Sequence, residues 1–475
     1  MDSGIQYAGE YTLEDVRLFA SSGNIIPLNG LVISISLFES IFSPTMSGTI
    51  TLLDANSIVS NLPIIGQEFL SFKIKTASIT EGGTSVIDFT KNSFSVYKID
   101  QRVEGTNSEL ITLHFASSEM LRNLRTRVSK SYTDTIDNIA IDVIQNSSYI
   151  NSKKDLFVEE TVGVRRLISP NSNPFTFIQK LSSEAISKKN GSPFFLFYEN
   201  KEGFNFRSLD SLYAQPITAE YNTGEFYHQE NSGTVVKNVL DEYSRPISHE
   251  MVAVNDTASN VRGGLLASDL ITYDIYGKRY ERKKFRYFNN FNDYGRLGNS
   301  PIYNTNFIDE FDNTVDNFTN ANIHLHSTSK EGENDAQFYS VDPNVVVGSK
   351  NVKSLYSPNG IENTLLPRQS KFVELNKGVS LNVKVHGSTN ISVGQIIQFN
   401  KQTVGNANES GDFDPYYTGR YIISNLRHVF ELTPKKEHSI VMSLVKDGYE
   451  QELEQNTAAR EPKNRFKGVV SKNII

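Results

Sequence analysis

The chain has 475 residues, a formal net charge of −7 and 38% hydrophobic residues. This length predicts roughly two to four domains, and the modest acidity does not point to a nucleic-acid-binding protein. Cysteine is absent, which excludes disulfides, thiolate metal sites and cysteine nucleophiles.

No apolar run approaches the roughly 18 residues that a membrane-spanning helix needs, so we expect no stable membrane insertion. The opening residues, MDSGIQYAGEYTLEDV, are polar and acidic. We therefore expect a protein made and used without export by the general secretory route. Tyr, Phe, Thr, Ile and Val recur in short runs between Asn, Ser and Gly, a composition typical of β structure.

Residues 1–116 are predicted to form a first β domain. After a polar lead-in over residues 1–27, alternating or apolar runs predict strands, and these runs are 31–38, 47–54, 68–75, 94–99 and 110–115. Short antiparallel strands joined by polar turns favour a small barrel or a sandwich.

Residues 117–220 are predicted to form an α+β domain. Ile136, Ile139 and Val143 share one face of a helix expected over residues 134–145. A second helix is expected after Asn173-Pro174, since proline favours the first helical turn. The aromatic runs PFFLFY (193–198) and FNF (204–206) predict two strands.

Strand patterns return over residues 221–254 and again over 367–450, which we predict to be a second β domain split in the sequence. Its clearest hairpin is residues 379–400, where Leu381, Val383 and Val385 alternate with polar residues. This period of two places one face of the strand on a core and the other in water.

The rest of the second half follows from similar patterns. A helix is expected over residues 368–375, ending near Gly378, and two more strands over 416–429 and 438–444. Residues 255–366 are predicted to be an inserted loop-rich, partly β region. Residues 451–475 are predicted to be a polar C-terminal tail.

An internal duplication is indicated by a spacing that recurs. Gly66-Gln67 and Gly394-Gln395 each precede an apolar strand, and the offset is 394 − 66 = 328. Adding 328 to Phe94 gives residue 422, inside a predicted strand, and adding it to Leu113 gives Val441. Residue identities between the two regions are weak, so chance agreement stays the alternative. The predicted fold class is β-rich α+β: two similar antiparallel β-barrel domains, an α+β domain and a loop-rich insertion.

Signatures of catalysis and cofactor binding are absent from the sequence. There is no HExxH, no Walker A loop, no GxGxxG after a strand and no GxSxG. Adjacent acids such as Glu159-Glu160 and Asp309-Glu310 are interpreted as solvated side chains rather than a glycosidase pair. We predict no catalytic residue, no cofactor and no enzymatic activity.

A metal site is not predicted either. His386, His428 and His438 stand alone on predicted strands, a pattern typical of surface or edge-strand histidines rather than of metal ligands. Asp412-Phe413-Asp414 resembles part of a calcium loop but lacks the glutamate that should follow.

One charged stretch, KRYERKKFR over residues 278–286, is a candidate contact surface. Its basic residues are Lys278, Arg279, Arg282, Lys283, Lys284 and Arg286. Basic side chains interleaved with aromatic ones suit phosphate contacts and base stacking. They equally suit docking to an acidic protein surface, or a solvated strand pair, and the three interpretations stay open. The acidic residues 309–316 are a candidate intramolecular partner.

Several stretches of the sequence resemble a known family. The stretches that carry the resemblance are PNSNPFTFIQKLSSEA (170–185), FFLFYENKEGFNFRSLDSL (194–212), GLLASDLITYDIYGKRYERKKFRYF (264–288), VKVHGSTNISVGQIIQFN (383–400) and YYTGRYIISNLRHVFE (416–431). In these and in their order the chain is similar to the central baseplate hub subunit of T-even-like, contractile-tailed bacteriophages. It resembles late-control tail proteins and type VI secretion spike hubs more distantly. The match runs from about residue 30 to 450 and is weakest over 290–366.

The resemblance implies a structural, non-enzymatic protein of the virion tail baseplate, assembled in the host cytoplasm. In the family, each subunit of a homotrimer contributes two similar barrels to a pseudo-sixfold ring. That ring joins the hexameric tail tube, or a tube-initiator protein, to the trimeric spike, with other baseplate proteins around it. DNA is implied only in passage through the central channel. The alternative is a cell-wall-degrading or glycan-binding tail protein, although Trp, a common sugar-stacking residue, is absent.

Overall fold

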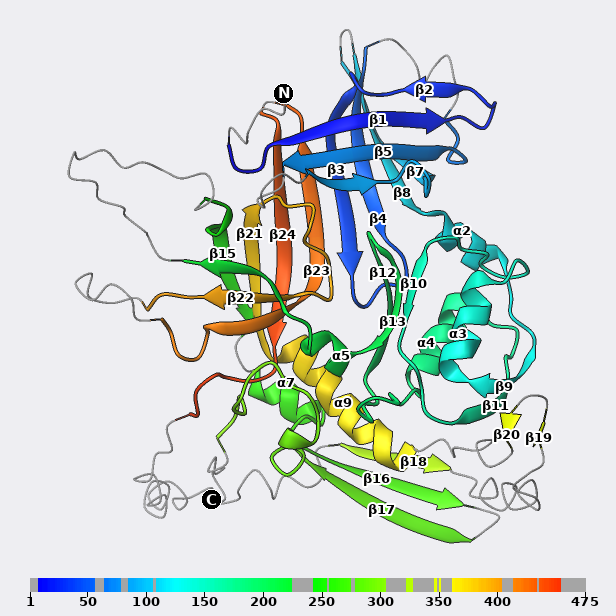
Figure 1. The fold of residues 1–475 in the computed structure, drawn as a ribbon, viewed down its shortest axis with the longest axis vertical. Coiled ribbons are helices and arrows are strands. Elements are labelled where there is room, and N and C mark those ends of the chain that lie inside the picture. The colour runs from blue at the N-terminus through cyan, green and yellow to red at the C-terminus, as the bar shows by residue number, and fades with distance from the viewer. Residues whose placement is uncertain are drawn as a thin grey trace, which may run out of the picture.

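The computed structural model describes residues 7–55, 64–77, 84–105, 108–223, 242–253, 256–274, 278–304, 322–327, 346–347, 350–351, 361–403, 413–433 and 435–453. The chain is β-rich, as predicted, with short helices in its middle third and one longer helix before the last strands (Figure 1). Within these residues, every helix is too short or too polar to cross a membrane.

The first β region runs from residue 11 to residue 117. Its strands are β1 (Tyr11–Phe19), β2 (Ile25–Pro27), β3 (Val32–Ser40), β4 (Ser47–Asp54), β5 (Phe69–Ala77), β6 (Thr84–Asp88), β7 (Phe94–Glu104) and β8 (Glu109–Ser117). The lead-in predicted over residues 1–27 was wrong in part, because it contains β1 and β2. Asp15 has a φ of 51°, and the pairing of β1 with β5 shifts between Glu14 and Arg17. This irregularity hides the alternation that would have marked a strand.

The α+β region lies beside this sheet. It contains α2 (Ser118–Arg125), β9 (Ser131–Thr135), α3 (Ile136–Gln145), β10 (Asp155–Val158), β11 (Val164–Ile168), α4 (Pro174–Ser182), β12 (Phe195–Asn200), β13 (Gly203–Ser208) and α5 (Leu209–Tyr213). The predicted apolar face of α3 is confirmed, since Ile136, Ile139 and Val143 are buried. They share a core with Phe177 and Ile178 of α4.

The second β region is formed by segments far apart in the sequence. Its strands are β14 (Ile217–Asn222), β15 (Pro246–Ala253), β21 (Val379–His386), β22 (Ile396–Asn400), β23 (Gly419–Glu431) and β24 (Glu437–Lys446). The hairpin predicted over residues 379–400 is present as β21 and β22. Leu381, Val383 and Val385 are fully buried, which assigns the core face of this strand.

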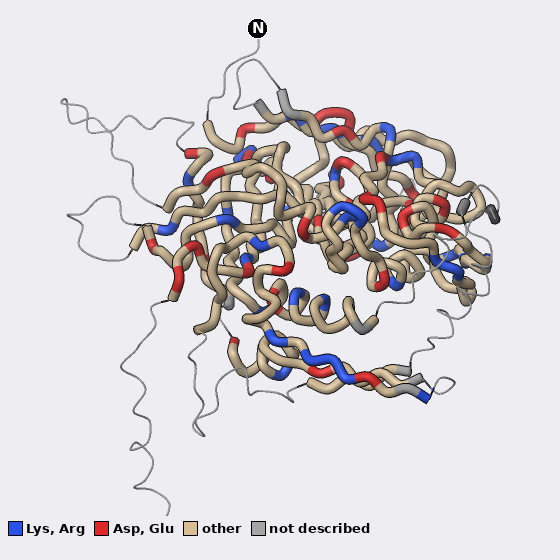
Figure 2. The backbone as a smooth tube through the Cα atoms, turned by 60° about the horizontal axis from the view of Figure 1, so that its bottom comes forward, with Lys and Arg blue, Asp and Glu red and all other residues tan. Residues whose placement is uncertain are grey.

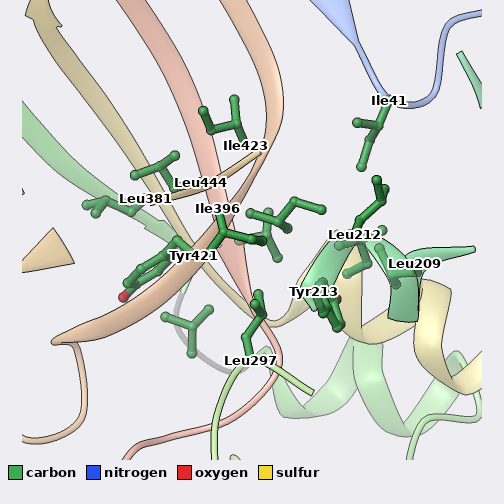
Figure 3. Packing of buried hydrophobic residues seen from close by; sticks show 14 of the residues in the cluster. Ile41, Leu209, Leu212, Tyr213, Leu297, Leu381, Ile396, Tyr421, Ile423 and Leu444 are labelled. Atoms are coloured by element: carbon green, nitrogen blue, oxygen red, sulfur yellow. The ribbon is translucent and has the colours of Figure 1, made fainter. Parts of the chain in front are cut away.

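The segment between β15 and β21 adds a small sheet and helices. Its elements are α7 (Thr257–Arg262), β16 (Ala267–Asp274), β17 (Arg279–Arg286), the 3-10 helix η1 (Phe291–Asp293), β18 (Ile323–Ser327), β19 (Val346–Val347), β20 (Lys350–Asn351) and α9 (Ile361–Lys377). Leu297 from this segment and Tyr213 from α5 point into the same core as Leu381 and Tyr421 of the second β region (Figure 3). The inserted segment therefore shares its core with the sheet that it interrupts.

Both β regions belong to one sheet of 14 strands. Its main order is β15-β21-β24-β23-β3-β4-β8-β7-β5-β1-β2, with β22 joined to β23 and β14 joined to β22. The regions meet where β3 pairs antiparallel with β23 (Figure 1). Among the described strands, pairing closes neither region into a ring, so barrel closure stays a prediction.

The strand order is the same in the two regions. The first reads β3-β4-β8-β7-β5, and the second reads β15-β21-β24-β23-β22. The irregularities recur as well: β7 shifts register against β8 between Val96 and Lys98, and β23 shifts against β24 between Ile423 and Asn425. A shared order with a shared bulge supports the duplication, because bulges are specific features of a strand pair.

The register corrects one predicted equivalence. Leu113 pairs with Ile99, and the residue in the same position of the second region is Met442, paired with Leu426. The offset is thus 442 − 113 = 329 at this strand. The predicted partner of Leu113 was Val441, which is 37% exposed, whereas Leu113 and Met442 are fully buried. A slip of one residue reverses the face of a strand. The slip arises because the turns differ in length: Val103 and its partner Leu110 are seven positions apart, whereas Val429 and its partner Ser439 are ten apart.

Candidate functional site

Over the part of the chain that the structure describes, no three His, Cys, Asp or Glu side chains gather as a metal site. Asp414 of the calcium-like fragment instead accepts hydrogen bonds from the backbone N–H groups of Tyr416 and Tyr417, at 3.0 and 3.1 Å. Asp412 and the acidic stretch 309–316 lie outside the described residues.

The paired acids at 159 and 160 have structural contacts. Glu159 accepts hydrogen bonds from the hydroxyls of Ser187 and Ser208, at 2.6 and 2.9 Å. Burial opposes ionisation of Glu159, but these hydrogen bonds outweigh it and hold its pKa below the ordinary value. Glu160 forms an exposed ion pair with Lys188 at 2.7 Å. A general acid needs a raised pKa, so this pair does not have the properties of a glycosidase site.

Two of the single histidines were wrongly predicted to lie at the surface. His428 of β23 and His438 of β24 are fully buried, and their rings are joined by a 3.0 Å contact between Nδ1 and Nε2. Phe430 stacks on His438 with ring centroids 4.1 Å apart. Burial, then the nearby charge of Lys201, lowers the pKa of His438 to about 3. The pair is therefore a neutral packing element between strands.

The basic residues predicted as a contact surface lie along β17 and the turn before it. β17 is an outer strand of the three-stranded sheet β17-β16-β18, which packs beside α9 at the bottom of the molecule (Figure 1). Arg282 donates through Nε to buried Asp269 of β16 at 2.9 Å, and Arg286 lies 3.6 Å from the same carboxylate. Lys283 contacts Asn363 of α9.

Other residues of this strand and of the turn before it are open to solvent. Tyr280 is 68% exposed, and Lys284 and Lys278 are exposed with it. Figure 2 shows the basic positions following one another along this strand at the lower edge of the molecule. The structure thus brings the predicted residues onto one strand, with some of their charge already compensated by Asp269.

A second, unpredicted feature is a junction where three regions of the chain meet. Glu39 of β3 is buried and accepts hydrogen bonds from the backbone of Lys201 and from the hydroxyl of Ser392, at 3.3 and 2.6 Å. Lys201, in the turn between β12 and β13, donates to the carbonyl of Ile391 at 3.0 Å. Burial raises the pKa of Glu39, and the charge of Lys201 opposes that shift. Both β regions are therefore tied to the α+β region at one point.

Two further buried ion networks hold the regions together. Lys154 lies 2.9 Å from Glu119 and 2.5 Å from Glu199, and Glu199 also accepts the backbone N–H of Met46 at 2.9 Å. This network fixes the α+β region to the turn between β3 and β4.

The other network joins the inserted segment to the second β region. Arg296 donates to Glu374 of α9 at 2.8 Å and lies 3.9 Å from Asp447, which follows β24. Lys371 of α9 is paired with Asp447. No sequence pattern marks these residues, because their partners are distant in the chain. Lys371, Glu374 and Asp447 are buried and the side chain of Arg296 is 10% exposed, and charges in such an environment are tolerated only when paired.

Buried polar contacts interlock the regions of this chain, and its sequence is similar to that of a phage protein. The chain is 22% identical over 405 residues to a probable baseplate hub protein of Vibrio phage KVP40, covering 83% of this chain and 85% of that protein. No protein-family model matches. This relative confirms the resemblance to baseplate hub proteins.

A solved structure shows a similar fold. The 43 kDa tail protein of prophage MuSo2 from Shewanella oneidensis superposes with a TM-score of 0.52 at 8% identity, over 92% of this chain and 100% of that one. A tail protein from Neisseria meningitidis gives a TM-score of 0.48 at 9% identity, over 92% and 97% of the two chains. The fold described above is thus similar to that of the prophage MuSo2 tail protein.

Proposed function

We propose that this chain is a structural hub of a contractile phage-tail baseplate, and that three copies form a ring with pseudo-sixfold symmetry. The observation that carries the proposal is the repeated strand order of the two β regions within one sheet. Three chains with two equivalent regions each supply six similar units, which suits a component between a sixfold tube and a threefold spike. The similarity to a probable baseplate hub protein supports the same role.

In this proposal the protein acts through its geometry. The buried ion networks fix the α+β region and the inserted segment on the sheet, so the ring is assembled from rigid subunits. Tail-tube and spike proteins bind its two faces, and DNA passes through the channel without a stable complex. The net charge of −7 is consistent with a conduit that does not retain DNA.

The basic residues of β17 and of the turn before it suit a further contact, at the outside of the proposed ring. We assign the exposed residues Tyr280 and Lys284 of β17, with Lys278 in the turn before it, to docking an acidic surface of another baseplate protein. Part of the charge on this strand is already compensated by Asp269, which favours a protein partner over a polyanion such as DNA.

Native mass spectrometry and negative-stain imaging of the purified chain test the hub function. A trimer with a central channel and six similar lobes is expected, alone or with its spike and tube proteins. A strict monomer at high concentration, without rings beside those partners, would overturn it. The non-enzymatic character is tested separately on purified peptidoglycan, where a zone of lysis would favour a cell-wall-degrading protein instead.

A further inference from the structure

Helix α9 has two faces with different surroundings. On one face Leu366, Lys371 and Glu374 are each at most 3% exposed and belong to the core and its ion network. The other face lines a cavity of about 500 Å³. The residues of α9 that line this cavity recur at helical spacing, and they are Ile361, Thr364, Leu365, Arg368, Gln369 and Phe372. This side of α9 therefore borders open space rather than the core.

The opposite walls of the cavity come from two other parts of the chain. Ser183 and Glu184 follow α4 in the α+β region, and His326 belongs to β18 of the inserted segment. The cavity thus lies between the α+β region and the inserted segment, and its walls are mostly apolar. Its volume is within the range of about 300–1,000 Å³ that is typical of small-molecule sites.

Arg368 brings a positive charge to this cavity. Its guanidinium donates from Nη1 to the carbonyl of Pro193 at 2.8 Å and from Nη2 to that of Phe195 at 3.2 Å. It also lies over the ring of Phe372, 4.4 Å from the centroid. Among the described residues no carboxylate forms an ion pair with Arg368, although Glu184 lines the same cavity. The guanidinium has five N–H groups, so several are left to bind a further acceptor.

The charge of Arg368 is only partly compensated by these contacts. Burial lowers the pKa of Arg368 to about 10, since the surrounding atoms disfavour the charged form. Arg296, on the other side of α9, has the carboxylates of Glu374 and Asp447 within 2.8 and 3.9 Å. Arg368 has carbonyl dipoles in their place, and a desolvated cation is stabilised far better by an anion. Guanidinium groups bind carboxylates through two parallel N–H groups.

We propose that this cavity binds a ligand in which a carboxylate is joined to an apolar group. Arg368 holds the carboxylate, and Leu365 and Phe372 pack against the apolar group. The ligand contacts both α9 and the end of α4, so it stabilises the attachment of the inserted segment to the α+β region. A free organic acid offers this chemistry, and so does an acidic residue beside an aromatic one in another protein.

Phenylacetate and its neutral analogue phenylacetamide separate charge from shape. Ligand-observed NMR with the full chain is expected to show saturable binding of phenylacetate in the millimolar range, as expected for so small a molecule. Phenylacetamide should bind about tenfold more weakly or not at all, because it lacks the charge that pairs with Arg368. Equal binding of the two, or binding of neither, would overturn the proposal.

Variants of Arg368 test whether the binding occurs in this cavity. Arg368→Gln removes the charge and should weaken phenylacetate binding by about tenfold or more. Arg368→Lys keeps the charge without the planar fork and should bind with intermediate affinity, which keeps the test decisive if the glutamine variant does not fold. Arg125→Gln, at an exposed position of α2 outside the cavity, is the matched control. Unchanged binding in both variants of Arg368 would contradict the assignment.

A blocked dipeptide, N-acetyl-Asp-Phe-amide, distinguishes the two sources of the ligand. If it binds as well as phenylacetate and displaces it, the site accepts a segment of another protein. If phenylacetate alone binds, the site takes a free organic acid. The hub function does not depend on this cavity, so it stands even if both probes fail to bind and the proposed site is overturned.

Discussion

The two β regions share a strand order but are stabilised differently. The core of the first is apolar, with a cluster of rings in which Phe89 and Phe94 have centroids 4.6 Å apart and Phe72 stacks on Phe94 at 5.7 Å. The second places Arg296 and Glu374 in contact with a core that continues into the inserted segment. The first region thus has an apolar core of its own, whereas the interrupted repeat adds directional ion pairs that fix the insertion on it.

The largest effect tests whether the two regions are equivalent at their centres. Ile50 and Val383 occupy the same position in β4 and β21, and both are fully buried. Ile50→Asp and Val383→Asp should each destabilise the protein by about 5 kcal/mol or more, because each buries an unpaired carboxylate. Urea denaturation measures the loss. Lys384→Asp, on the exposed face of β21, is the control, and a Val383→Asp protein of native stability would show that the faces are misassigned.

The next effect concerns the network that joins the second region to the inserted segment. Arg296→Met leaves Glu374 and Asp447 buried with Lys371 as the remaining cation of the network, and we expect a loss of about 3–5 kcal/mol. Arg296→Lys keeps the charge and should lose less. A loss below about 1 kcal/mol for Arg296→Met, within the range of surface pairs, would mean that the network contributes little.

The buried histidines predict a pH dependence at the contact between the regions. The pKa of His438 falls from its ordinary value to about 3 in the folded protein, so the unfolded chain binds the proton more readily. Stability is therefore present above about pH 6.5 and is lost as the pH falls toward 3, by about 2 kcal/mol at pH 5.

Thermal unfolding of the native chain and of His438→Leu between pH 7.5 and 5 measures this term. The variant should lose less stability than the native chain over that interval, since its side chain does not titrate. Equal losses in the two proteins would assign the pH dependence to other groups.

The smallest effect compares two turns. Gly66 and Gly394 have φ angles of 83° and 80° at the start of equivalent strands. Alanine in this conformation costs about 1–2 kcal/mol, and at Gly394 the added Cβ also meets the hydroxyl of Tyr198. At Gly66 the nearest atom is the carbonyl oxygen of Tyr97, at 3.5 Å. Gly394→Ala should therefore be less stable than Gly66→Ala by about 1 kcal/mol in chemical denaturation, because a clash adds to the strain. Equal values would show that Tyr198 moves aside freely.

These same glycines also indicate how much of the fold could be predicted from the sequence. The recurring Gly-Gln pairs and the alternation over residues 379–386 were sufficient to predict the duplication and the core face of β21. The turn from β7 to β8 is shorter than the turn from β23 to β24, so the offset changes along the repeat and Leu113 was paired with Val441 rather than Met442. Pairing of strands fixes a register that composition and periodicity leave open.

The buried charges were not predictable for a related reason. Glu39, Lys201 and Arg296 carry the residue types of a surface, and each is stabilised by groups that are distant in the sequence. The basic strand was recognised because its residues are adjacent along the chain. Local patterns were therefore sufficient to identify the basic residues of β17. The buried junctions could not be predicted, because they depend on contacts that only the folded structure brings together.

The pairing of β3 with β23 has a consequence for assembly kinetics. Because it joins two parts of one polypeptide, it forms in a unimolecular step and does not dissociate on dilution. In the proposed ring, every second contact is of this kind, so only the alternate contacts depend on protein concentration. Fusing two repeats in one chain thus halves the number of encounters needed to close the ring and keeps the order of the two kinds of repeat strictly alternating.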